Sequence, residues 1–409
     1  MTGGPMAGGD LVVRNALVFD GVSADLVEGA IRIVDGTIAE VGDVGASRPG
    51  EQEIDAHGAV VTPGLIDAHF HAYAVSMITS RIESAYLSYL ALAASLRLRD
   101  ALGRGFTTVR DVAGGDAGLS AAIDRGLIPS PRYFWTGAAL SQTGGHGDHR
   151  GAEDDVCFHG GHMCELVDGV DALRVAVRSR FHHGAHAIKI MTSGGVASLT
   201  DPLRPAQYSA EEVRAVTEEA GRRGSYVAAH SYSPESIRHS IENGVRSIEH
   251  GNLLDPETAA AMAAAGAVLV PTLAAYDAMD RRGDEVGLSP VSAAKNKQVL
   301  EAGKYAVRFA LDAGVTVGFG SDLMGDLASD QLVGVRLQAE ASSPLDALRS
   351  LTSANAELLQ RDDLGRIAAG ALGDLVIWSG NPLEDIAVIS DEGRARTVVS
   401  RGRVAVAAS

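Results

Sequence analysis

The chain has 409 residues, which exceeds most single domains and fits one barrel-sized domain with a smaller unit. Apolar residues make up 46% and charged residues 21%, as in ordinary soluble enzymes. The chain has 35 Lys and Arg against 52 Asp and Glu, a net charge of -17, and this excludes the basic surface that nucleic-acid binding needs. The two cysteines form no disulfide framework, so we expect a reducing, cytoplasmic location.

Neither the N-terminus nor the interior predicts a membrane segment. The first ten residues lack a basic region followed by an apolar run, so they are not typical of a signal peptide. The uncharged stretch 259–276 approaches the length of a membrane span, but Gly266 and Pro271 interrupt it. We therefore predict the end of a helix, a turn at 265–266 and a short strand.

Both ends of the chain read as short β-strands. Residues 10–60 alternate apolar runs with turn dipeptides such as Asp-Gly, and residues 365–407 follow the same pattern. Each segment is too small to bury a core alone, so we expect the two to pair in one β-sandwich. The predicted parts are residues 1–61 and 363–409 for the sandwich and 62–362 for the domain between them.

The middle of the chain alternates strands and helices. Helical patterns, for example over 209–223, 234–243, 290–313 and 344–360, follow most of the apolar runs. The predicted strands are VVTPGLIDAH, TTVRD, RYFWT, AIKIM, SYVAAH, RSIEHG, AVLVPT and VTVGFGSD. Eight strands with intervening helices predict an α/β fold of the (β/α)8 TIM-barrel type.

Six metal-binding residue types stand at or just after the ends of these strands. Side chains from the carboxyl ends of parallel barrel strands meet on one face. The six are His69 and His71 in LIDAHFH, Lys189 in AIKIM, His230 in VAAHSYS, His250 in SIEHGN and Asp322 in GFGSDL. Four imidazoles, an amine and a carboxylate at one place predict a site for two divalent metal ions. These donor types favour Zn²⁺, and cobalt and manganese also accept them.

Each of these residues also has a structural interpretation. His69 and His71 are two apart, so a strand directs both to one side, either as ligands or as core histidines bonded to backbone. Lys189 interrupts an apolar run, where burial lowers the pKa of an amine, and it could equally pair with a carboxylate or form a Schiff base. Asp322 follows a serine, a pairing that also caps helices.

The segment from 137 to 169 after the third predicted strand is long and irregular, as functional loops are. It contains His146 in GGHGDH. It also contains a cluster of Cys157, His159, His162 and Cys164, whose spacing matches neither zinc fingers nor zinc ribbons. We expect this cluster to line the rim of the pocket and not to hold a structural zinc.

The ordered motifs VTPGLIDAHFH, GFTTVRDVAGG, the barrel lysine and GSD together resemble the amidohydrolase superfamily of binuclear metal hydrolases over nearly the whole chain. TGGHGDH and AHSYSPESIRHSIENGVRSIEHGN are closest to its prolidase and carboxypeptidase branch. This resemblance implies that Lys189 is carboxylated and bridges the metals, and that His146 polarises the scissile carbonyl. It also implies that Tyr232 and Arg238 hold a substrate carboxylate and that the chain forms a homo-oligomer.

These observations predict an enzyme that cleaves the C–N amide bond of dipeptides, Xaa-Pro or Xaa-amino acid, through a metal-bridging hydroxide. Asp322 would transfer the proton from the attacking water to the leaving nitrogen. One alternative is an amidase for N-acyl amino acids, including aryl-acyl conjugates such as ochratoxin-like mycotoxins. Another is a cyclic-amide hydrolase of the imidazolonepropionase type, which would leave Arg238 idle. A non-catalytic scaffold is disfavoured because all six ligands are present.

Overall fold

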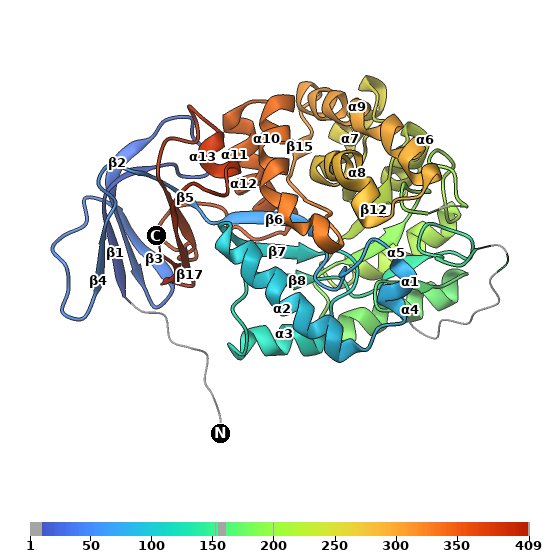
Figure 1. The fold of residues 1–409 in the computed structure, drawn as a ribbon, viewed down its shortest axis with the longest axis horizontal. Helices are drawn as coiled ribbons and strands as arrows, with labels where there is room; N and C mark the ends of the chain where they lie inside the picture. The colour runs from blue at the N-terminus through green and yellow to red at the C-terminus, as the bar shows by residue number, and fades with distance from the viewer. Residues whose placement is uncertain (1–9, 152, 154–160, 199, 408–409) are drawn as a thin grey trace.

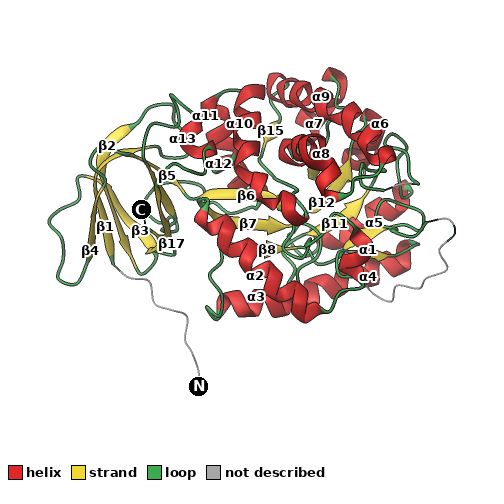
Figure 2. Ribbon diagram, in the orientation of Figure 1, coloured by secondary structure: helices red, strands yellow, loops and turns green. Residues whose placement is uncertain are grey.

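The computed structural model describes residues 10–151, 153, 161–198 and 200–407. Strands from the two ends of the chain lie together at one side of the molecule, and the middle of the chain forms the larger part beside them (Figure 1). In the larger part, strands lie inside and helices outside (Figure 2). The fold is therefore α/β, as the alternating sequence pattern predicts.

One eight-stranded sheet joins the two ends of the chain, in the order β18-β17-β16-β5-β1-β2-β3, with β4 parallel to β1. Its apolar side chains, among them Leu11, Ile31 and Leu375, form a core of their own. The strands are β1 (Leu11–Val18), β2 (Val27–Val34), β3 (Thr37–Gly42), β4 (Gln52–Asp55), β5 (Val60–Pro63), β16 (Leu375–Trp378), β17 (Arg396–Ser400) and β18 (Arg403–Val406).

The larger part contains two sheets in which every strand pair is parallel, one of three strands and one of seven. The first runs β6 (Leu65–Phe70), β7 (Phe106–Asp111), β8 (Arg132–Trp135). The second runs β10 (Cys164–Leu166), β9 (Ala139–Ser141), β11 (Ile188–Met191), β12 (Val227–Ser231), β13 (Ser247–His250), β14 (Val268–Val270), β15 (Thr316–Val317).

Backbone hydrogen bonds join both edge strands of the three-stranded sheet, β6 and β8, to the chain of the seven-stranded sheet. Beyond β15, the amide of Ala68 donates to the Phe319 carbonyl at 2.9 Å, and the amide of Asp322 donates to the His69 carbonyl at 2.8 Å. At the other edge, the amide of His186 donates to the Trp135 carbonyl at 2.8 Å. The ends of β6 and of the segment after β15 are thereby held side by side.

Helices follow most of the parallel strands and cover them (Figure 2). They are α1 (Thr79–Glu83), α2 (Leu87–Gly103), α3 (Ala117–Asp124), α4 (Val170–His182), α5 (Ala210–Gly221), α6 (Pro234–Glu242), α7 (Pro256–Ala265), α8 (Leu273–Val286), α9 (Pro290–Asp312), the 3₁₀ turn η1 (Gly325–Asp330), α10 (Gln331–Ala341), α11 (Pro344–Ser350), α12 (Ser353–Leu358) and α13 (Ala387–Ser390).

Local sequence sets where several helices begin and end. Ser233 and Ser343 cap α6 and α11 and are each followed by proline, whose missing amide costs nothing at the first helical position. The helix predicted over 344–360 is instead two helices, α11 and α12. The break places the Leu351 carbonyl where it accepts a hydrogen bond from the Ile66 amide at 2.7 Å.

The predicted strand over 60–69 is also divided. β5 pairs with β1 and β16 in the end sheet, whereas β6 joins the parallel strands, so the chain passes between the two parts at Gly64. A side chain at Gly64 would collide with Thr107, which explains why glycine stands there. The loop predicted over 137–169 contains two short strands, β9 and β10.

The uncharged stretch 259–276 forms the end of α7, a left-handed turn at Gly266 and then β14, as predicted. Among the residues that the structure describes, no helix combines the length and apolar character needed to cross a membrane.

Candidate metal centre and active site

The six predicted ligands all line one pocket at the carboxyl ends of the parallel strands. His69, Lys189, His230 and His250 lie within the last residues of their strands, while His71 and Asp322 come from the segments that follow. They belong to β6 and the residue after it, β11, β12, β13 and the segment beyond β15. Positions that are far apart in the sequence therefore meet because parallel strands end at one face.

Asp322 lies at the centre of this group. Its Oδ1 is 2.9 Å from Nε2 of His71 and 3.4 Å from Nε2 of His69, and its Oδ2 is 3.7 Å from Nδ1 of His250. One ligand atom each from His69, His250 and Asp322 lie within 4.8 Å of one another, close enough to bind a single metal ion. The His230 ring packs against His250 with 4.4 Å between centroids.

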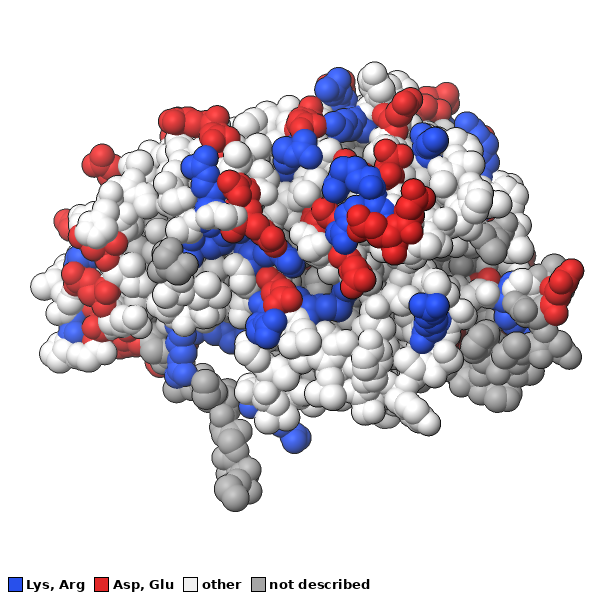
Figure 3. Space-filling model, in the orientation of Figure 1, with Lys and Arg blue, Asp and Glu red and all other residues white. Residues whose placement is uncertain are grey.

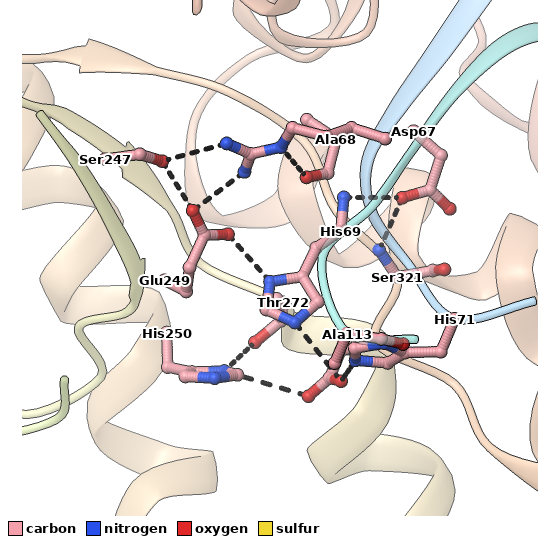
Figure 4. A network of polar contacts seen from close by, with 12 residues as sticks. Asp67, Ala68, His69, His71, Ala113, Ser247, Glu249, His250, Thr272 and Ser321 are labelled. Carbon is pink, nitrogen blue, oxygen red and sulfur yellow. Dashed lines mark hydrogen bonds and ion pairs between the residues drawn. The ribbon is translucent and has the colours of Figure 1, made fainter. Parts of the chain in front are cut away.

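A buried carboxylate fixes the orientation of His69. Nδ1 of His69 donates to Oε2 of Glu249 at 2.7 Å, and Arg110 Nη2 donates to Oε1 of the same carboxylate at 2.7 Å (Figure 4). All three side chains are buried. Because Nδ1 carries the proton, the lone pair is on Nε2, which faces Asp322. Such a partner orients and strengthens a metal-binding histidine.

The other three histidines are fixed in the same manner. Nδ1 of His71 donates to the Ala113 carbonyl at 3.3 Å, and Nε2 of His230 donates to the Gly194 carbonyl at 3.1 Å. Nδ1 of His250 lies 2.8 Å from the hydroxyls of both Thr272 and Tyr276. Each of the four imidazoles thus has one nitrogen engaged by the protein, which leaves the other available as a ligand. The donor set fits divalent metals such as zinc.

Backbone strain also concentrates here. His250, Thr272 and Asp322 have φ angles of 75°, 49° and 53°, in the left-handed region that side chains disfavour, and β-branched threonine most of all. They stand at or after the ends of β13, β14 and β15. Such conformations persist only where surrounding structure enforces them, and they cluster at functional sites.

Burial lowers the pKa values of two of the histidines and of Lys189. Desolvation holds the pKa values of His230 and His250 well below the usual 6.5. Desolvation likewise lowers the pKa of Lys189 to about 8. Within the described part of the chain, no carboxylate lies within ion-pair distance of Lys189, so the alternative of a simple buried ion pair does not describe this lysine.

His146 stands over the centre from the loop after β9. Its ring stacks on that of His230 with 4.1 Å between centroids, and its Nδ1 lies 3.1 Å from the Ser198 hydroxyl and 3.6 Å from Asp201. Gly195 passes so close to this ring that a side chain there would collide with it. The structure therefore brings His146 into the pocket with the six predicted ligands.

The structure places the two residues that were predicted to hold a substrate carboxylate in different surroundings. Tyr232 is buried in the pocket, where its hydroxyl lies 2.7 Å from that of Tyr276. Arg238 is outside the pocket lining: on α6 it pairs with Glu257 at 2.8 Å and donates to Thr258. The structure thus brings Tyr232 to the predicted ligands, whereas Arg238 lies on α6 outside the pocket lining.

The Cys/His cluster is only partly visible, because Cys157 and His159 lie outside the described residues. Nε2 of His162 donates to the Ala85 carbonyl at 3.2 Å. Cys164 lines the pocket, and burial raises the pKa of its thiol to about 12, so the thiol stays protonated. The described part of the cluster thus places Cys164 at the pocket.

Glu249 and Arg110 were not among the predicted site residues. Each is a charged residue within a predicted strand, in RSIEHG and TTVRD, and a buried charge requires an opposite one. Pairing the Arg110 charge with the Glu249 charge could have identified the support behind His69.

Residues 60–405 match the sequence model of the Amidohydrolase family. The chain belongs to this family. This amidohydrolase is a hydrolase of carbon–nitrogen bonds, as its sequence motifs predict. It is 31% identical to ochratoxinase from Aspergillus niger, over 96% of this chain and 85% of that protein. It is 28% identical to imidazolonepropionase from Anaeromyxobacter dehalogenans, over 96% of this chain and 95% of that protein.

A solved structure extends the likeness to the prolidase branch. The amidohydrolase matches a prolidase complexed with N-methylphosphonate-L-proline at 42% identity, with a TM-score of 0.94. The match covers 98% of this chain and all of that one (100%). The resemblance to prolidase-like amidohydrolases is thereby confirmed.

Proposed function

We propose that the protein hydrolyses the amide bond of a small substrate with a free carboxylate next to the leaving nitrogen, a dipeptide or an N-acyl amino acid. The observation that carries this proposal is the set of four histidines, each fixed by a protein contact at one nitrogen, around Asp322 and Lys189. Such a set is costly to bury unless it binds cations. The likeness to the prolidase supports the substrate class.

The fold supports the same conclusion. We infer that the two parallel sheets form the predicted (β/α)8 barrel and that the end sheet forms the predicted sandwich. The hydrogen bonds from Ala68 to Phe319 and from His186 to Trp135 connect both edges of the three-stranded sheet to the seven-stranded sheet, which supports closure of a barrel. Residues 62–362 then form the hydrolase domain. The chain enters this domain from β5, the last strand of the N-terminal part of the end sheet.

Two divalent ions, for which zinc suits the donor types, would be held by His69, His71, His230, His250, Asp322 and a carbamate on Lys189. The low pKa of Lys189 favours the neutral amine that reacts with carbon dioxide. Bound ions would supply an acidified water and positive charge for a developing oxyanion.

Side chains of the protein would carry out proton transfer and would bind the substrate carbonyl and carboxylate. Asp322 lies among the ligand nitrogens, where it can accept a proton from the attacking water and return it to the leaving nitrogen. An amide requires this protonation because an amine anion is a poor leaving group. His146 stands over His230, where it can donate to the substrate carbonyl. We assign the contact with the substrate carboxylate to the Tyr232 hydroxyl, because Tyr232 lines the pocket and Arg238 does not.

An N-acyl amino acid is the second candidate class, and the 31% identity to ochratoxinase favours it. Cyclic amides are a third class to test, because the chain is similar to imidazolonepropionase. A cyclic amide without a carboxylate would need no contact with Arg238, and Arg238 pairs with Glu257 outside the pocket lining.

Three further expectations belong to this proposal. The substrate is a small molecule, and neither nucleic acid nor membrane is a partner. We place the protein in the cytoplasm.

We expect a homo-oligomer. Along one face of α2, the side chains of three apolar residues are exposed: Tyr89 by 58%, Leu92 by 71% and Leu96 by 52%. Figure 3 shows a largely uncharged surface in this region. Light scattering at micromolar concentration tests the assembly.

The first experiment combines elemental analysis with hydrolysis of a panel of Xaa-Pro dipeptides, other dipeptides and N-acyl amino acids. We expect about two metal ions per chain and turnover of one class. The matched variant Lys189→Ala should lose metal and activity, and a short carboxylic acid in the buffer should restore part of both. Metal-free protein, prepared without chelator, would overturn the proposal. Two ions with turnover of cyclic amides alone would select the third class.

A further inference from the structure

Sulfur-containing side chains concentrate in the active-site pocket. The chain has eight methionines and two cysteines, of which Met1, Met6 and Cys157 lie outside the described residues. Six of the remaining seven line the pocket, and the exception is Met262 in α7. The six, which we name the sulfur wall, are Met77, Met163, Cys164, Met191, Met279 and Met324.

The sulfur wall is assembled from separate parts of the chain. Met77 follows β6, Met163 precedes β10, Met191 ends β11, Met279 lies in α8, and Met324 stands just beyond the candidate ligand Asp322. A single apolar helix face does not produce this arrangement. The methionines pack into two different apolar clusters and meet only at the pocket.

The chemistry of the wall restricts what can bind against it. A thioether is flexible and polarisable, accommodates irregular apolar shapes and contacts aromatic rings favourably, but it offers no hydrogen-bond donor. Among the described residues that line the pocket, Lys189 is the only lysine or arginine, and it belongs to the metal centre. An anionic substituent against the wall would therefore be desolvated without a lysine or arginine to pair with it.

The proposed substrate has two halves, and only one of them suits the sulfur wall. The half that carries the carboxylate needs polar partners, which the histidines and Tyr232 at the metal centre supply. The acyl half has no such requirement and can occupy the remaining apolar space. Ala113, Val196 and Ala197 add further apolar surface to that space.

We propose that the sulfur wall selects amides whose acyl group is large, uncharged and apolar, such as an aroyl or medium-chain alkanoyl group. This inference rests on the proposed function, and it narrows the substrate from any dipeptide or N-acyl amino acid to apolar N-acyl amino acids. Dipeptides whose first residue has a charged side chain would be poor substrates.

The test is a series of acyl groups on one amino acid, the one released fastest in the panel above. The probes are its N-acetyl, N-succinyl, N-hexanoyl and N-benzoyl derivatives. We expect kcat/KM for hexanoyl and benzoyl to exceed acetyl by about tenfold or more, in the range that apolar pockets give for added methylenes, and succinyl to be slowest. Equal rates across the series, or a preference for succinyl, would refute the role of the wall. No hydrolysis of any panel member would instead refute the proposed function.

Variants assign the preference to the wall. Met77 is half-buried, so Met77→Lys should fold, and we expect it to lower hexanoyl hydrolysis about tenfold while raising succinyl hydrolysis. Met324→Gln, nearly the same length, should lower the benzoyl-to-acetyl ratio. Met262→Leu is the control and should leave all ratios unchanged. If both wall variants keep the wild-type ratios at wild-type metal content, the inference is wrong.

Discussion

Replacing Glu249 by glutamine tests whether the metal centre depends on its buried support. Glu249 accepts from His69 Nδ1 and from Arg110, each at 2.7 Å. Glutamine has one acceptor oxygen in place of two, so it can satisfy Arg110 or His69 but not both. If its amide faces His69, the proton moves to Nε2, the atom that should bind metal.

The substitution should change both the metal affinity and the free energy of unfolding. Losing such a support costs about 10- to 100-fold in metal affinity, or roughly 1.4–2.8 kcal/mol. Removing one partner of a buried ion pair costs about 3–5 kcal/mol of stability, and the retained hydrogen bond places Glu249→Gln near the lower limit.

The chain offers a matched control. Glu51, next to β4, pairs with Arg32 of β2 at 2.7 Å, and the two side chains are 0% and 3% exposed. Glu51→Gln should also lower the free energy of unfolding, yet leave metal affinity unchanged. Metal affinity is measured by competition with a chromophoric chelator and stability by urea unfolding. If Glu249→Gln binds metal as tightly as Glu51→Gln, the support argument is refuted.

Three other perturbations probe the site. Asp322→Asn should retain metal, since asparagine tolerates the left-handed φ of 53° at this position. We expect its kcat to fall by about two to four orders of magnitude. Near-normal turnover would show that Asp322 does not transfer the proton. Gly195→Ala should displace the His146 ring and lower kcat roughly 100-fold at unchanged metal content, and an unchanged kcat would show that His146 is not needed in this position. Desolvation lowers the pKa values of His149 and His186 from 6.5 to about 4, so the unfolded chain binds more protons than the folded one between these values. Stability of the metal-free protein should therefore be full above pH 6.5 and decrease as the pH falls to 4, as followed by urea unfolding; a midpoint that is constant over this range would contradict the burial of these rings.

The sequence alone determined the α/β alternation and the strand-end positions of the metal ligands. Each ligand lies in or just after an apolar strand, and parallel strands direct their carboxyl ends to one face, so proximity follows from periodicity. Helix starts at Ser233 and Ser343 were equally local, because capping involves only neighbouring residues. The break between α11 and α12 could not be predicted from neighbouring residues, since the carbonyl at this break bonds to a distant residue, Ile66.

Only the tertiary structure decided which other side chains reach the site. Arg238 and Tyr232 are six residues apart in one motif, yet the turn of α6 directs Arg238 to Glu257 while Tyr232 remains in the pocket. The support of His69 by Glu249 joins residues 180 positions apart. The sulfur wall has no sequence periodicity at all, because its members come from separate loops, strands and helices. Such groupings depend on how elements pack together, and local patterns carry no record of that packing.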